Sequence, residues 1–192
     1  MFILGITLNQ SYMKAGSSIV IPLMSFIFIL GLISLVFVVN LYRITLIDIN
    51  LLLVVMCSLS LITSYFTYPF LIQSAKDASF VKSLFFRLFF VYSYNWVVCG
   101  GFSVCLFLAT NYCFSNEVVV SRQVTIENKK QLPPDLYVKR WTPLIVVQFF
   151  EGIKKEVFIK DATYDALAIG DVYNLKLKKG LWGIDVIVSD KA

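Results

Sequence analysis

The residues SIVIPLMSFIFILGLISLVFVVNL, from Ser18 to Leu41, decide the fold of this chain. They contain no charge over 24 positions, and Arg43 follows almost at once. At about 1.5 Å per residue, a helix of this length measures about 36 Å, enough to cross a hydrocarbon core about 30 Å thick. Pro22 falls in the first turn, where a missing N–H group costs little. The stretch therefore predicts a membrane-spanning helix.

Two further uncharged stretches follow, one from Asn50 to Ile72 and one from Leu88 to Ser115. Arg87 and Glu117 flank the second of them and mark its limits. Tyrosine and tryptophan residues near the end of one stretch and the start of the next are typical of the aromatic belt at a membrane surface. We predict a bundle of three transmembrane helices over residues 18–115, with spans at 18–41, 50–72 and 88–115.

The first 17 residues, MFILGITLNQSYMKAGS, begin with an apolar patch that no basic residue precedes. A secretory signal peptide needs a basic first region and a cleavage site of small residues, and this segment offers neither. We expect residues 1–17 to form an interfacial segment that leads into the first span.

Charged residues are few and unevenly placed. They make up 15% of the chain, against about 25% in a typical soluble domain, and the mean hydropathy is +0.78. Residues 1–115 hold only seven of them, and the other 12 basic and 10 acidic residues follow. The signs alternate there without any basic cluster, so the net charge of +5 gives no reason to expect nucleic-acid binding. The composition predicts an apolar membrane part followed by a soluble domain over residues 116–192.

Several classes of chemistry are excluded by residues that the chain lacks. It has no histidine, which removes Ser-His-Asp and Cys-His catalysis and histidine-ligated metal sites. Its four cysteines all lie within the apolar stretches, where we expect them to pack as small apolar residues. No phosphate-binding loop, dinucleotide fingerprint or Cys-x-x-Cys pair occurs. We therefore expect no enzyme activity, no metal and no cofactor.

Small residues recur every four positions in the third predicted span, at Gly101, Cys105, Ala109 and Cys113. Such a stripe lets another helix backbone approach closely. Packing among the three helices of one chain is the first interpretation, and oligomerisation is the second. No ionisable residue lies in the middle of a span, which argues against a proton-coupled or ion-coupled transporter.

From Glu117 onward the apolar residues alternate with polar ones, as in β-strands. Leu144 to Phe150 is apolar on both faces, as a central strand would be. Lys155 alternates with Lys154 and shares a face with Val157 and Ile159, and glycine turns separate the later strands. We predict a small antiparallel five-stranded β-barrel or roll, SH3-like or OB-like.

Two tryptophans stand out in this domain as possible contacts with a partner or with the membrane surface, Trp141 and Trp182. Trp182 lies between Gly180 and Gly183, at the tip of a predicted hairpin. An exposed aromatic side chain there anchors a partner or enters the lipid headgroups. The competing interpretation is a plug that closes one end of the barrel.

One arrangement of turns resembles a known group. A hairpin at Phe150-Glu151-Gly152 is followed by a short turn with Tyr164, by Ile169-Gly170-Asp171 before a strand, and by a closing hairpin with two glycines. Over about residues 117–189 this resembles the small extracytoplasmic β-domains of bacterial membrane proteins of unknown function. The resemblance implies a membrane-tethered adaptor domain with no known active site.

These observations together favour a non-enzymatic integral membrane protein whose C-terminal β-domain is a protein-interaction or assembly module. Its expected partners are the lipid bilayer and either another protein or a second copy of itself. The alternative is an immunity or accessory protein for a membrane-acting partner such as a toxin or a secretion component. A small transporter or membrane enzyme is the third hypothesis.

The basic residues of the short segments predict the orientation. Lys14, Lys76, Lys82 and Arg87 lie on one side of a three-span topology, and Arg43 lies in the short loop on the other. Basic residues of short loops favour the cytoplasmic side. We expect a cytoplasmic N-terminus and an extracytoplasmic C-terminal domain, in a bacterial inner membrane. Counting the basic residues just after the third span would make the two sides equal.

Overall fold

The computed structural model describes residues 2–74, 83–134, 141–149 and 152–188, with side chains from Ile21 onward. The chain divides into two compact units. The helical unit contains Met1–Phe37 and Leu53–Cys105, and the sheet unit contains Val38–Leu52 and Leu106–Ala192. The sheet unit therefore includes the end of the first helix, the start of the second and the end of the third apolar segment.

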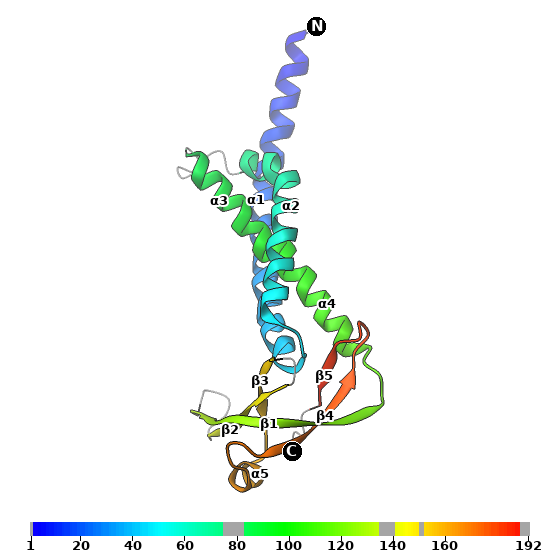
Figure 1. Cartoon of the computed structure of the whole chain (residues 1–192). Helices are drawn as coiled ribbons and strands as arrows, with labels where there is room; N and C mark the ends of the chain where they lie inside the picture. The colour runs from blue at the N-terminus through cyan, green and yellow to red at the C-terminus, as the bar shows by residue number, and fades with distance from the viewer. Residues whose placement is uncertain (1, 75–82, 135–140, 150–151, 189–192) are drawn as a thin grey trace. The chain divides into compact units, whose positions relative to one another are not determined.

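Three apolar helical segments precede the sheet (Figure 1). They are α1 (Phe2–Ile44), α2 (Ile49–Ser74), and a third segment made of α3 (Leu84–Asn95), the π-helix η2 (Trp96–Gly100) and α4 (Gly101–Cys113). The stretches that are long and apolar enough to cross a membrane are Ile21–Ile44, Ile49–Gln73 and Leu84–Cys113, with mean hydropathies of 2.7, 2.0 and 1.5. The prediction of three long apolar helices is confirmed, and α1 is continuous through residues expected to be interfacial. Lys76 and Lys82 lie outside the described residues.

Glycines lie where the helices of the helical unit pack most closely. A Cβ atom added to Gly31 would lie 3.0 Å from the backbone oxygen of Val97. One added to Gly100 would lie 3.0 Å from the hydroxyl of Ser60, in α2. Since real Cβ atoms rarely approach so closely, these positions favour glycine. The third segment thus packs against both α1 and α2 through residues without a side chain.

The sheet unit contains five antiparallel strands: β1 (Val119–Leu132), β2 (Thr142–Gln148), β3 (Lys154–Phe158), β4 (Val172–Lys179) and β5 (Asp185–Ile187). Their order in the sheet is β3-β2-β1-β4-β5, and the short helix α5 (Asp161–Ala166) connects β3 to β4. The prediction of a small five-stranded antiparallel domain is confirmed as a curled sheet, or half-barrel.

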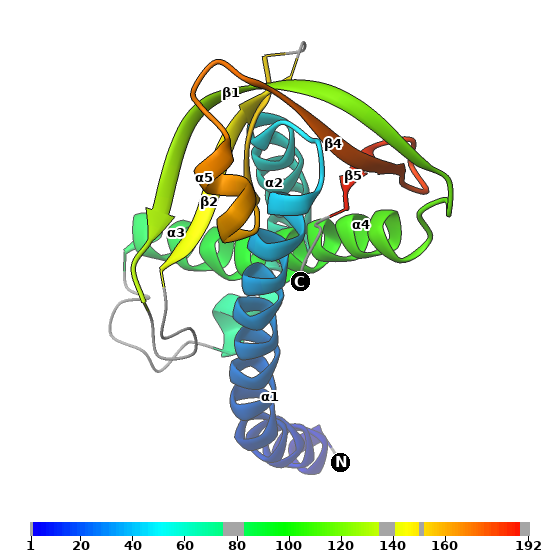
Figure 2. The same cartoon turned by 90° about the horizontal axis from the view of Figure 1, so that it is seen from below.

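The curl of this sheet comes from β1, which arcs across it in Figure 2. Residues 119–125 of β1 pair with β4, whereas residues 125–132 pair with β2. The register with β2 shifts between Ile126 and Asn128, which marks a β-bulge. Because a bulge bends its strand and increases the local twist, the two halves of β1 run in different directions, one paired with β4 and the other with β2.

The core of the sheet unit lies on the concave side of this curl. Its buried members are apolar residues of all five strands together with Phe149: Val124, Ile126, Ile145, Val147, Phe149, Val157, Leu175, Leu177 and Ile187. Val124 and Ile126 are buried as their alternation predicts, but Val118 and Val120 are exposed. The period of two continues through these valines, but Val118 precedes β1 and Val120 is its second residue, before the buried positions of the strand.

Candidate functional site

The α1–α2 loop lies along the edge of strand β5. Thr45 forms an antiparallel bridge with Val186, and the N–H of Leu46 donates to the carbonyl oxygen of Asp185 at 2.8 Å. Thr45 is completely buried, and Leu46 packs against the core of the sheet unit. The loop therefore extends the sheet by one short pairing beyond β5 and covers part of an edge that would otherwise be open.

Strand β3, at the other edge of the sheet, contacts the same region through Lys155. The Lys155 ammonium donates to the carbonyl oxygen of Tyr42 at 2.9 Å and lies 3.2 Å from the centre of the Tyr42 ring. Lys155 is only 3% exposed. Burial lowers the pKa of Lys155 to about 8, and the carboxylate of Asp48 opposes this shift. We call the group of Tyr42, Thr45, Leu46, Lys155 and Val186 the seam, since it joins the two edge strands to the end of α1 and to the loop that follows it.

The hairpin between β4 and β5 is held by Asn111 of α4. The Asn111 side chain donates through Nδ2 to the carbonyl of Ile184 at 3.1 Å and accepts through Oδ1 from the N–H of Trp182 at 3.1 Å. Its backbone carbonyl accepts from the N–H of Leu181. A Cβ atom added to Gly180 would overlap the Asn111 carboxamide. Asn111 is fully buried, so its polar groups find their partners inside the chain.

Trp182 lies at the tip of this hairpin, as the sequence predicts. Its ring stacks on Phe107 with 5.9 Å between centroids, and its indole N–H donates to the Thr110 hydroxyl at 3.0 Å. The residue is still 55% exposed, and it is not part of the sheet core. We call the contacts of Phe107, Thr110 and Asn111 with residues 180–184 the hairpin clamp. The role of Trp182 in contacting a partner or a membrane stays a prediction.

Trp141 occupies a different part of the sheet unit. It directly precedes Thr142, which pairs with Leu132 at the end of β1. Trp141 is 56% exposed and Leu132 is 39% exposed. The two tryptophans singled out by the sequence are thus attached to different strand ends, and the structure does not combine them into one site.

The stripe of small residues follows the buried face of the third segment only at its beginning. Gly101 is buried, and a Cβ atom there would lie 3.1 Å from the Ser34 hydroxyl. Cys105 and Ala109 are half-buried, and Cys113 is exposed. A spacing of four drifts around a helix of 3.6 residues per turn by about 40° at each step. The fully buried positions further along α4 are instead Val104, Leu108 and Asn111.

Asn95, the residue directly before the π-helix, forms a cluster of polar contacts inside the helical unit. Asn95 is buried and donates through Nδ2 to the Thr67 hydroxyl and to the Val91 carbonyl, both at 2.8 Å. Its Oδ1 accepts from the Cys99 thiol at 3.5 Å. These bonds connect the third segment to α2 and use both ends of the carboxamide. The cluster is uncharged and fits helix–helix association through side-chain hydrogen bonds.

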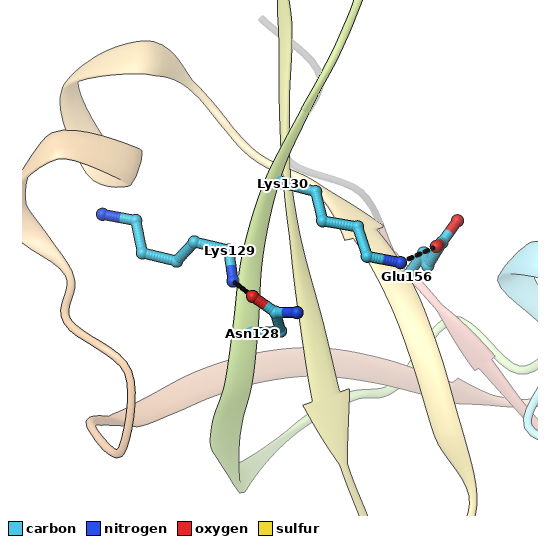
Figure 3. A network of polar contacts seen from close by, with 4 residues as sticks. All are labelled: Asn128, Lys129, Lys130 and Glu156. Carbon is cyan, nitrogen blue, oxygen red and sulfur yellow. Dashed lines mark hydrogen bonds and ion pairs between the residues drawn. The ribbon is translucent and has the colours of Figure 1, made fainter.

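The side chains of Lys129 and Lys130, which are neighbours in β1, point to opposite faces of the strand, as Figure 3 shows. Lys130 forms an ion pair with Glu156 at 3.2 Å, across strand β2, on an exposed face. The Lys129 ammonium donates to the carbonyls of Tyr164 and Leu167, and it lies 4.2 Å from the Tyr164 ring centre. A cation at the C-terminal end of a helix is favourable, so Lys129 fixes α5 against the sheet.

A cavity of about 260 Å³ lies where β1 and β2 pair. It is lined by Gln123, Val124, Thr125, Gln148 and Phe149. Two amide groups and one hydroxyl could form hydrogen bonds there, but no lining side chain is ionisable. The volume is below the range of about 300–1,000 Å³ that is usual for small-molecule sites.

Comparisons with protein-family models, with curated proteins and with solved structures found no match. Within the described ranges, no three His, Cys, Asp or Glu residues are grouped so that they could hold a metal ion. The absence of metals and cofactors nevertheless stays a prediction.

The seam was not predicted from the sequence, although a signal for it is present. Lys155 shares its strand face with Val157 and Ile159, so its side chain had to enter an apolar region. A lysine in that position needs a partner for its charge. The identity of this partner, Tyr42, depends on a contact over more than 100 positions of the chain. No local pattern encodes such a contact.

Proposed function

We propose that this chain is a three-span integral membrane protein whose β-domain binds another protein or a second copy of itself, without enzymatic activity. The three apolar helices support the membrane assignment. The resemblance to bacterial membrane proteins with a small tethered β-domain supports the adaptor role. Within the sheet unit, the seam and the hairpin clamp also hold the strands to residues 42–46 and to the end of α4.

The observation that carries the interaction role is the apolar pair Leu132 and Trp141. Both side chains are exposed where β1 ends and β2 begins. Tryptophan is enriched among the residues that dominate binding energy at protein interfaces. Leu132 follows the polar residues ENKKQ, from Glu127 to Gln131, so Leu132 and Trp141 form an apolar spot next to a polar surface. We infer that this end of the hairpin contacts the partner.

Site-specific photocrosslinking in native membranes tests this role. A photoreactive residue at position 141 should form an adduct with a defined protein or with a second copy of the chain. The same probe at Lys160, which is also exposed, should not give that adduct. Adding Leu132→Ser to the probe at position 141 should reduce the yield. Identical adducts from positions 141 and 160 would contradict the proposed contact.

The proposed orientation places the N-terminus in the cytoplasm and the β-domain outside, in a bacterial inner membrane. The charge distribution around Arg43, described above, supports this choice. The contacts of the seam are compatible with an odd number of spans, since the α1–α2 loop and the β-domain would then share one side of the membrane. Protease added to intact spheroplasts should remove the β-domain. Complete protection until the membrane is broken would show the opposite orientation.

Of the two predicted barrel types, the OB-like type has more support. A long, bent β1 pairs with both β2 and β4, and one short helix connects β3 to β4. These features fit a partly open five-stranded barrel of that kind. The immunity or accessory role and the transporter role remain hypotheses from the sequence, since no contact in the described residues favours either.

A further inference from the structure

The hairpin at residues 180–183 has exposed apolar side chains and a backbone whose N–H groups are all hydrogen-bonded within the chain. Its side chains Leu181 and Trp182 are apolar and more than half exposed. Its four consecutive N–H groups all have partners inside the chain. Gly180 donates to Ile184, Leu181 and Trp182 donate to Asn111, and Gly183 donates to Gly180. The indole N–H is also bonded, to Thr110. A turn with every donor satisfied does not need water.

The depth of this hairpin follows from the helix to which it is clamped. The third segment, Leu84–Cys113, has 30 residues and is therefore about 45 Å long. A hydrocarbon core of about 30 Å leaves about 7 Å of a centred span beyond the core at each end. Phe107 lies about 9 Å before the end of α4, and Thr110 about 4.5 Å before it. In such a centred span Thr110 would lie just outside the hydrocarbon core and Phe107 just inside it, so the two residues that hold the indole would bracket the boundary with the headgroups.

The geometry points to a lipid-facing hairpin: Leu181 and Trp182 occupy the boundary between the headgroups and the acyl chains, beside the last two turns of α4. This inference rests on the proposed membrane span. Indole rings favour this zone because they have an apolar body and a polar edge. Backbone donors there must find partners within the protein, and Asn111 supplies two of them. Exposed Leu106 in α4 and exposed Phe114, just after the end of α4, provide further apolar surface before and after the clamp residues.

Fluorescence quenching by brominated lipids tests the inference. The chain has three tryptophans, so replacing two of them with phenylalanine leaves a single reporter. The full-length variants that retain only Trp182, only Trp141 or only Trp96 are reconstituted into phosphatidylcholine vesicles. The bromine atoms are placed either near the headgroup or near the ends of the acyl chains. Circular dichroism confirms that each variant is folded.

Trp182 should lose more fluorescence to bromine near the headgroup than to bromine near the chain ends. Trp96 should show the reverse order, because the segment begins at Leu84, earlier than the sequence predicts, so this tryptophan lies near its middle and not at the surface belt. Trp141 should not be quenched by either lipid. Quenching of Trp96 without quenching of Trp182 would overturn the lipid-facing hairpin and leave the membrane span intact, with a protein contact then expected at Trp182. If neither is quenched, both proposals fail.

Discussion

Replacing Lys155 with methionine should stabilise the protein at neutral pH. The substitution removes a charge from the seam and keeps an unbranched side chain of similar length. Burial lowers the pKa of Lys155 from 10.5 to about 8. Since each pH unit between the unfolded and folded pKa corresponds to about 1.4 kcal/mol, the charge costs about 3 kcal/mol in the folded state. The contacts with Tyr42 offset part of this cost, so we expect a gain of about 1–3 kcal/mol.

The free energy of unfolding should depend on pH differently in the wild-type protein and in the Lys155→Met variant. The unfolded chain retains the Lys155 proton up to pH 10.5, whereas the folded chain releases it above about pH 8. Between these values the unfolded state binds more protons, so the stability of the wild-type protein rises with pH. The Lys155→Met variant lacks this contribution. Its advantage over the wild-type protein should be largest below pH 8 and should disappear toward pH 10.5.

Thermal unfolding in detergent, followed by tryptophan fluorescence from pH 7 to pH 10, measures the effect. For a chain of this size, 1 kcal/mol corresponds to about 2–4 °C in the melting temperature. Lys154→Met is the matched control. Lys154 is the exposed neighbour on the opposite strand face, and its ion pair with Glu127 is worth about 0–1 kcal/mol. A difference between Lys155→Met and wild type that does not change with pH would refute the reasoning, as would a lower melting temperature than the control.

Three further changes test other contacts. Gly180→Ala should weaken the hairpin clamp by about 1–3 kcal/mol, because the added Cβ would overlap Asn111. Hydrogen exchange of the backbone amides of residues 180–184 should then become faster, and an unchanged exchange rate would contradict the clamp. Gly101→Leu should disrupt helix packing, seen as a lower melting temperature, whereas Leu106→Phe on the exposed face should be nearly neutral. A fragment that begins at Glu117 lacks the α1–α2 loop, so its circular dichroism should show a lower melting temperature than that of the full chain.

The elements of both units follow from patterns that are local in the sequence. An uncharged stretch of more than 20 residues can satisfy its backbone in an apolar solvent only as a helix, and all three such stretches are helical. In the sheet unit, alternation and glycine turns predict five strands, and Val124 and Ile126 show the expected burial. The length of β1 was not predictable, since from Glu127 to Gln131 the strand is polar and exposed except at the half-buried Lys129.

Side-chain roles were harder to derive because they depend on contacts distant in the sequence. The small-residue spacing draws attention to Gly101, but only the packing partner decides which face of the helix is buried. Asn111 is recognisable from the sequence as a polar residue near the end of a span. Its partners, Trp182 and Ile184, follow more than 70 residues later. The same limit applies to Lys155, whose apolar face was evident and whose partner was not.

The contacts within the sheet unit affect how much conformational freedom it would lose on binding a partner. The chain passes from Cys113 to Val119 in a few residues, and the N–H of Asn116 already donates to the Lys179 carbonyl at 2.7 Å. The hairpin clamp adds contacts with the end of α4, and the seam adds contacts with residues 42–46, all within the sheet unit. A sheet stabilised by such internal contacts loses less conformational freedom on binding than a loosely packed one. The exposed pair Leu132 and Trp141 therefore belongs to a preorganised sheet, which lowers the entropic cost of binding the proposed partner there.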